Sequence, residues 1–361
     1  MNNIRKIGLT ALAGSLVTLG SAVAGEMSVS GGINTTLKFG KPNQGNNTGR
    51  SIGSDKDVTF SGGGELDNGT TFSMSTTLYD NYEMSGSTTT ITTPSLGSFQ
   101  VGASTGSASG KYDEEVPQAY EQVSDAKQTM ANLVGNFMDN NHIMYTPPAM
   151  EFMGATFQAH AGYTPQAADT AVADGGQQAY SATWGAGKEL GLTISYDALK
   201  VGIYGGEREN TTPNAATGQQ INDEFNGAWY AKYSVGPISI GYSETYLDGG
   251  VTQDLENPTA SKAERTAGGI FTGEQMSIAF NVNDNMSISY TSSDETYDTQ
   301  DDALTATTDD DDVTENIDAI QVAYSMGGMS IKAYNMEVSN PDQDDNAADQ
   351  SITEIALGFA F

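Results

Sequence analysis

A two-residue alternation of apolar and polar side chains recurs along most of this chain. In the segment 27–39, Val29, Ile33 and Leu37 lie on one face, and Ser30 and Asn34 lie on the other. The same period appears in the segments 72–78, 199–203, 276–282, 286–290 and 329–332. A period of two predicts β-strands with one apolar and one polar face. It fits a soluble sandwich and a membrane barrel equally well, because these differ only in what covers the apolar face.

The connections between these segments distinguish the two architectures. Tight connections fall at 67–69, 197–198, 236–237, 284–285 and 327–328. Long polar connections lie near 40–55, 105–140, 164–177, 208–224, 248–264, 295–315 and 338–350. Short turns at one rim and long loops at the other are typical of an up-and-down membrane barrel. A Greek-key sandwich has no reason to alternate so regularly.

The sequence therefore predicts an all-β fold, a transmembrane antiparallel up-and-down β-barrel of about sixteen strands. The strands are expected at 27–39, 56–66, 70–80, 87–93, 97–104, 141–147, 154–163, 178–196, 199–207, 225–235, 238–247, 266–282, 286–294, 316–326, 329–337 and 351–361. Alternation is weak in 87–93, and 178–196 and 266–282 are long enough to be bulged or split. All ten prolines fall in or beside a proposed connection, as expected of residues that cannot donate to a strand ladder.

The composition agrees with a barrel better than with a soluble core. Leu, Ile, Val and Phe supply only 63 of 361 residues, and 46 acidic against 15 basic residues give a formal charge of −31. Such values alone would indicate disorder. A closed barrel removes the conflict, because lipid covers its apolar face and every backbone group is paired around the ring.

Several classes of function are disfavoured by the same composition. Nucleic acid is a poor partner for so acidic a chain, because phosphate binding needs clustered Lys and Arg. The absence of Cys excludes disulfides, thiolate metal sites and Cys nucleophiles. With only His142 and His160 available, a His-built metal site or a Ser-His-Asp triad is disfavoured as well.

The N-terminus has the features of a secretory signal peptide over residues 1–24. Arg5 and Lys6 precede an apolar stretch, and Ala22-Val23-Ala24 is a small-residue cleavage site. The alternative, a membrane anchor helix, needs a longer apolar stretch. After residue 24 no run of about 18 apolar residues occurs, which predicts no transmembrane helix. Residues 25–361 are expected to form the single barrel domain.

The last strand completes a resemblance to a known family. Ile355, Leu357, Phe359 and the terminal Phe361 share one face of an alternating segment. Together with the signal peptide, the strand count and the long third loop, this resembles the Gram-negative general diffusion porins. The resemblance implies a homotrimer in the outer membrane, in contact with lipid and lipopolysaccharide. It also implies that Phe361 presents the chain to the barrel assembly machinery. The small residues Thr35, Gly62, Gly64 and Thr76, on the presumed outward face, would allow close packing between barrels.

In that family the third loop folds into the barrel and narrows it, which would place a constriction loop at 105–140 here. The residues fit a buried helical segment at 118–134 and a solvated surface loop equally well; the resemblance implies the first. Two departures leave the narrowest ring undefined. The Pro-Glu-Phe-Gly-Gly signature of the enterobacterial third loop is absent, and so is the dense arginine cluster of the facing wall.

Charged residues suggest how such a pore would select solutes. Rings of carboxylates favour cations in a pore. The candidate constriction residues in the third loop are Asp113, Glu114, Glu115, Glu121 and Asp125. The basic residues on the presumed lumen face are Lys38, Lys200, Lys232 and Lys332. The last three lie close to short turns, so they are expected at the periplasmic mouth, away from the third loop, unless they snorkel to water.

The segment 295–315 is rich in carboxylates and contains no basic residue. Its densest part is Asp309, Asp310, Asp311 and Asp312. Such oxygens suit Ca²⁺, but the fixed spacing of a calcium loop is missing, so a solvated acidic loop is the competing interpretation. No other cofactor is indicated.

The predicted function is passive diffusion of small hydrophilic solutes and ions through a water-filled pore, with modest cation preference and no enzymatic reaction. Three alternatives stay open. They are a substrate-specific channel, a non-conducting structural or adhesive barrel, and a barrel enzyme that uses His142 or His160 as its base.

Overall fold

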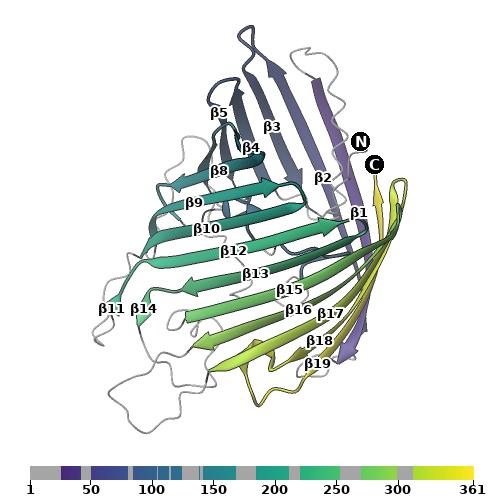
Figure 1. The fold of residues 1–361 in the computed structure, drawn as a ribbon. Helices are drawn as coiled ribbons and strands as arrows, with labels where there is room; N and C mark the ends of the chain where they lie inside the picture. Colours follow the sequence, from purple (N-terminus) through teal and green to yellow (C-terminus); the bar gives the residue numbers. More distant parts are fainter. Residues whose placement is uncertain are drawn as a thin grey trace.

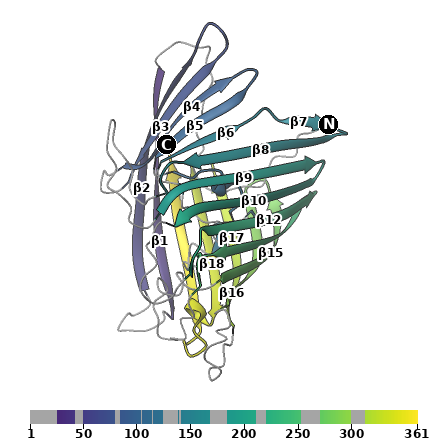
Figure 2. The ribbon, with the colours of Figure 1, turned by 90° about the vertical axis from the view of Figure 1, so that its left-hand side faces the viewer.

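The structure, a computed structural model, describes residues 26–41, 50–79, 84–103, 105–113, 115–123, 138, 141–167, 184–210, 220–252, 270–298 and 312–361. The predicted signal peptide lies outside these residues. Strands follow one another in chain order around a single wall, as two perpendicular views show (Figures 1 and 2).

Each strand pairs antiparallel with its neighbours in sequence. The first eight positions around the ring are β1 (Glu26–Lys41), β2 (Arg50–Glu65), β3 (Thr71–Leu78), β4 (Met84–Thr93), β5 (Gly97–Ala103), β6 (His142–Thr146) with β7 (Met150–Phe152), β8 (Ala155–Thr164) and β9 (Trp184–Tyr196). The other eight are β10 (Leu199–Asn210), β12 (Glu224–Val235), β13 (Ile238–Asp248), β15 (Ile270–Asn283), β16 (Met286–Asp298), β17 (Val313–Met326), β18 (Met329–Ser339) and β19 (Gln350–Ala360). A separate two-stranded sheet joins β11 (Gln220–Ile221) to β14 (Val251–Thr252).

The ring is closed between the first and last strands. β1 pairs with β19 from Gly32↔Ala360 to Lys41↔Ser351. Two further backbone bonds join Gly31 and Phe361, at 2.9 and 3.0 Å between nitrogen and oxygen. β6 and β7 both pair with β8 and count as one position, interrupted by Pro147 and Pro148, which have no N–H to donate. The barrel therefore has sixteen strand positions, as predicted.

All sixteen predicted segments, including the weakly alternating 87–93, correspond to one strand each. The main differences are at the ends. β2 begins at Arg50 because its first residues pair with β1 although they do not alternate. The acidic segment 295–315 is not all loop, since Glu295 and Asp298 belong to β16 and Glu315 belongs to β17. Thr296, Tyr297 and Thr314 have high β-propensity and extend these strands.

The short connections fall where the sequence predicts them. Asp197 and Gly236 adopt positive φ values of 50° and 56° in two of the turns. Tight hairpin turns require this left-handed conformation, which Gly, Asn and Asp tolerate best. Because the turns are short, they hold neighbouring strands in register, and the wall between β9 and β19 alternates between its two faces except at register shifts near Arg208–Asn210 and Asn281–Asn283.

The two faces of the barrel differ in polarity as a membrane barrel requires. Leu190, Ile203 and Ile320 are exposed by 59–64% on the apolar face, which forms the outside. The other face forms the inside and carries mainly Ser, Thr, Gly and occasional charged residues. It also carries buried apolar clusters, such as Leu247 with Phe271 and Tyr297, and Ile317 with Met336 and Val338 against Tyr120 of the third loop. Tyr196 and Tyr233 are exposed on the apolar face beside short turns, where an interfacial aromatic girdle is expected.

Helical structure is scarce in the described residues. None of their helices has the length and apolar character needed to span a bilayer. The described part of the third loop contains a 3-10 helix, η1 (Ser109–Lys111). The helix predicted from residue 118 does not begin there, because residues 118–122 form bends and irregular backbone that bond to the barrel wall. Most of the rest of that predicted helix, residues 124–134, lies outside the described residues.

Candidate functional site

The described part of the third loop, residues 105–113 and 115–123, is held along the polar face of the wall. Its first anchor is Glu189 of β9, a carboxylate that is 5% exposed. Glu189 accepts hydrogen bonds from the backbone N–H of Ala108 (2.7 Å) and Ser109 (3.1 Å), and from the hydroxyl of Tyr204 (2.9 Å). Charge-assisted bonds of this kind are stronger than neutral ones. Glu189 therefore fixes the start of η1 on the wall.

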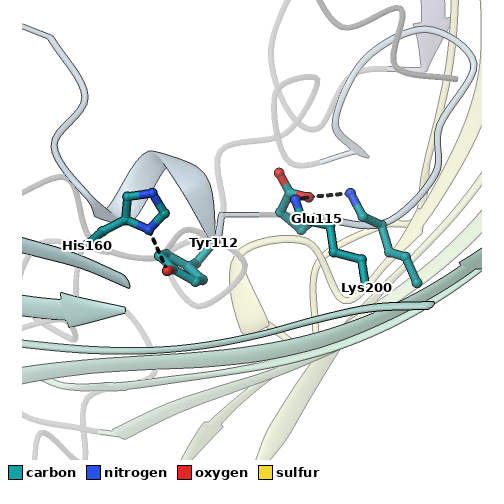
Figure 3. A network of polar contacts seen from close by, with 5 residues as sticks. Tyr112, Glu115, His160 and Lys200 are labelled. Atoms are coloured by element: carbon teal, nitrogen blue, oxygen red, sulfur yellow. Dashed lines mark hydrogen bonds and ion pairs between the residues drawn. The ribbon is translucent and has the colours of Figure 1, made fainter. Parts of the chain in front are cut away.

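The second anchor is aromatic. Tyr112 is fully buried, and its hydroxyl bonds to Nδ1 of His160 on β8 at 2.9 Å (Figure 3). Its ring stacks on Tyr204 with 5.5 Å between ring centroids. The ring lies directly on Gly191, where an added Cβ would come within 2.2 Å of its Cε2 atom. The missing side chain at residue 191 is thus what makes room for Tyr112.

The third anchor is an ionic bridge. Oε2 of Glu115 accepts hydrogen bonds from Nζ of Lys200, at 3.3 Å, and from Nζ of Lys232 (Figure 3 shows the first). Lys200 and Lys232 are directly opposite each other in the pairing of β10 with β12. Two like charges in this position repel. The carboxylate between them offsets that repulsion and ties the loop to both strands.

The last anchors lie further around the ring. The N–H of Ala119 bonds to Ser289 of β16 at 2.9 Å, and the N–H of Tyr120 bonds to Gln321 of β17 at 2.7 Å. The hydroxyl of Tyr120 donates to Glu354 of β19 at 2.7 Å. Nζ of Lys332 lies 5.1 Å from the centre of the Tyr120 ring.

These anchors follow successive strands. Between Glu189 on β9 and Gln321 on β17 there are six inter-strand steps, or about 29 Å at about 4.8 Å each. The twelve residue-to-residue steps from Ala108 to Tyr120 can span at most about 40 Å. The segment therefore runs along the wall, and the difference between the two lengths is taken up by η1 and by the bends at residues 119–121.

Burial changes the acidity of the two loop tyrosines. It raises the pKa of Tyr112 to about 12, with the carboxylates of Glu115 and Glu189 adding to the effect. Burial also raises the pKa of Tyr120, and the nearby carboxylates of Glu121 and Glu354 act in the same direction. Both hydroxyls are thus neutral at physiological pH.

The structure brings together candidates that the sequence treats separately. Glu115 contacts two of the predicted lumen lysines, and Lys332 lies over the Tyr120 ring, so the expectation that Lys200, Lys232 and Lys332 lie apart from the third loop is wrong. The expectation fails because the third loop lies close to the wall, so that a lysine side chain near a short turn can still reach it. Lys38 pairs with Glu354 at 3.9 Å. The remaining described candidates, Asp113 and Glu121, lie in the wall-bound segment; Glu114 and Asp125 lie outside the described residues.

Most of the predicted metal-binding aspartates lie outside the described residues, whereas both histidines lie within them. Asp309, Asp310 and Asp311 lie outside the described residues, and Asp312 precedes β17. Within the described ranges, no group of three or more His, Asp or Glu side chains is arranged to hold a metal ion. Nδ1 of His142 lies 3.0 Å from the carbonyl oxygen of Met138, and His160 bonds to Tyr112.

The anchoring residues Glu189, Gln321 and Glu354 were missed in the sequence. A signal for them exists, because each is a large polar residue on the inward face with a small inward residue next to it: Gly187 and Gly191 beside Glu189, Ala319 and Ala323 beside Gln321, and Ala356 beside Glu354. Such a residue needs a partner when it is buried. The partner's identity depends on the path of the third loop, which periodicity does not contain.

Comparisons with known proteins agree with this architecture. Residues 8–285 match the family model described as Gram-negative porin. The chain belongs to the Gram-negative porin family. It is accordingly a passive diffusion channel of the outer membrane.

Solved porins share the fold at low sequence identity. A porin refined at 1.8 Å resolution aligns with a TM-score of 0.62 and 14% identity, over 93% of this chain and 100% of that one. An anion-selective porin from Comamonas acidovorans aligns with a TM-score of 0.62 and 13% identity, over 93% of this chain and 99% of that porin. OmpT of Vibrio cholerae in its trimer form aligns with a TM-score of 0.60 and 15% identity, over 94% of this chain and 100% of OmpT. No curated protein matches the chain in sequence.

Proposed function

We propose that the third loop of this porin narrows the channel and sets the size limit for small hydrophilic solutes. The observation that supports this most is the series of contacts that ties residues 108–113 and 115–120 to the inner face from β8 to β19. A segment held there occupies space in the lumen and is fixed well enough to act as a rigid filter. It also lines part of the pore with the charged side chains of Asp113, Glu115 and Glu121.

We also propose a modest cation preference. Carboxylates outnumber basic residues by 46 to 15 in the whole chain. A field of this sign concentrates cations at the mouth of a pore, and salt screens it over about 10 Å at 0.1 M. The anion-selective porin with the same fold indicates that individual residues, and not the barrel, determine the sign of the preference.

Liposome swelling tests the size limit. Proteoliposomes in isotonic solutions of neutral sugars should swell at rates that fall steeply as the sugar becomes larger. Replacing residues 108–120 by a short Gly-Ser linker should flatten this dependence. Equal swelling rates for large and small sugars in the native protein would contradict a constriction, and the absence of swelling would favour the structural or adhesive alternative. Saturation by one sugar alone would favour a substrate-specific channel.

The assembled state is proposed to be a homotrimer, by likeness to the OmpT trimer form. The outward face of β1–β3 offers small residues, among them Thr35, Gly62 and Gly64, beside exposed Met27 and Met74. Small residues allow close contact where packing, and not the hydrophobic effect, drives association in lipid. Native mass spectrometry in detergent should give a trimer; a monomer alone at all concentrations would rule it out.

Other partners are proposed on the same basis. The exposed apolar face fits outer-membrane lipid and lipopolysaccharide, and the exposed side chain of Phe361 is available to the barrel assembly machinery. Ca²⁺ on the loop that contains Asp309–Asp312 remains a proposal, to be tested by calorimetric titration of the purified barrel. Replacing these four residues with Asn should abolish the heat of binding if the ion binds there.

A further inference from the structure

We propose that Asp55 and Asp57 of β2 determine the charge preference of this pore, and that Glu115 of the third loop contributes little to it. The inference rests on the proposed cation preference and names the residues that would produce it. The solutes favoured would be small cations, such as hydrated metal ions and organic amines, over anions of the same size.

Glu115 is a weak source of cation preference because its charge is already neutralised. One of its oxygens accepts bonds from both Lys200 and Lys232, so the three groups together carry a net charge of +1. The part of the third loop around Glu115, taken together with Lys200 and Lys232, therefore attracts anions slightly. In this proposal the excess of negative charge along the water-filled path is supplied by another part of the wall.

The anchors of the described third loop do not include strands β2–β5, although Thr105 lies beside Gly102 of β5. The polar face of these strands consists almost entirely of hydroxyl side chains, which pair across strands, as Thr59 does with Thr77 and Thr92 with Ser98. These residues are half-buried, whereas Ser277, Ser289 and Thr291 on the opposite side are at most 5% exposed. The water-accessible path therefore runs along β2–β5, where neutral hydroxyls supply hydrogen bonds without charge.

Asp55 and Asp57 are the ionisable residues of this polar face away from its turn end, where Glu65 lies. Asp55 is opposite Asn34 of β1, and Asp57 is opposite Gly32. Because residue 32 has no side chain, the Asp57 carboxylate leans over it, with Oδ1 3.2 Å from the position of a Cβ there. Neither carboxylate has a described lysine or arginine within ion-pair distance, and Lys38 of the neighbouring strand β1 pairs with Glu354.

The two aspartates also lie at the level of the loop. The hydroxyl of Tyr120, in the wall-bound segment, bonds to Glu354 and has the Asn34 side chain as a hydrogen-bonding neighbour. Asn34 is the cross-strand partner of Asp55. Solutes that pass between the third loop and the hydroxyl wall therefore pass these two carboxylates.

Reversal potentials under a KCl gradient test the inference on the full-length protein in planar bilayers. A unit charge about 6 Å from an ion in water should change the K⁺/Cl⁻ permeability ratio about threefold at 0.1 M salt. Asp55→Asn and Asp57→Asn should each lower the ratio by about that factor. The matched control, Asp294→Asn, alters an exposed carboxylate on the outer face and should leave it unchanged.

Each outcome decides the matter. A ratio in the double variant equal to that of the native protein overturns the inference. The proposed function would still stand after an unchanged ratio in the double variant, provided that the native pore admits neutral sugars and prefers cations. Absence of conductance in the native protein overturns both. Should the double variant fail to assemble, Asp55→Asn alone decides, because that side chain is exposed and its loss leaves no buried group without a partner.

Discussion

Replacing Glu115 with Gln removes the charge that holds Lys200 and Lys232 together. Two donors on one acceptor oxygen lie within about 6 Å of each other. At an effective dielectric of about 20 their repulsion is about 3 kcal/mol, and the 40% exposure of the Lys200 side chain reduces this to about 1 kcal/mol. Losing the charge-assisted bonds costs about 1.5 kcal/mol more. Local opening of the loop between Ala108 and Ala119 should become easier by about 2.5 kcal/mol.

Hydrogen exchange followed by mass spectrometry measures this opening directly. A change of about 2.5 kcal/mol corresponds to an exchange rate roughly 70-fold faster for amides of residues 110–118. The strands should keep their protection, because backbone pairing around the ring does not involve Glu115. Glu337→Gln, an exposed carboxylate on the outer face, is the matched control. Adding Lys200→Gln and Lys232→Gln to the Glu115 variant should restore part of the protection. Equal exchange in the native protein and the Glu115 variant would refute the bridge.

Three further predictions concern the other anchors. Gly191→Val should displace the Tyr112 ring and increase open-channel noise in single-channel recordings. Gly205→Val should not, because a Cβ at residue 205 meets Phe225 at an ordinary 3.5 Å. Equally quiet recordings from both variants would contradict the role of Gly191 in making room for Tyr112. The pKa of Tyr112, raised to about 12, means that the neutral hydroxyl stabilises the folded loop fully below pH 10 and loses this effect between pH 10 and 12. Loop exchange should accelerate in that range in the native protein and not in Tyr112→Phe; an identical alkaline response would exclude this group. Phe361→Ala should lower the yield of barrel in the outer membrane but not the stability of the purified barrel, since the backbone bonds to Gly31 remain; an unchanged yield would remove the assembly role.

The strands were predictable because a period of two and the positions of turns are local properties of the sequence. Even β4, with little alternation in 87–93, was identified, since its neighbours on both sides fixed its place. Strand ends were less predictable. The extension of β16 to Asp298 depends on pairing with β17, and polar residues outside the apolar band carry no periodic signal.

The candidate site was predictable in composition but not in arrangement. Lys200 and Lys232 were correctly placed on the polar face, yet their contact with Glu115 depends on the route of a loop between β5 and β6. That route is set by pairs distant in sequence, such as Ala108 with Glu189 and Tyr120 with Gln321. A single sequence does not encode such pairs in any period or motif.

Single-channel recording in planar bilayers tests the central claim most directly. The purified native protein should insert in discrete steps of ohmic conductance, and a KCl gradient should give a reversal potential of the sign that cation preference requires. Discrete conductance with anion preference would contradict the proposed selectivity while leaving a diffusion pore. Folded protein that inserts without conductance would contradict the channel itself.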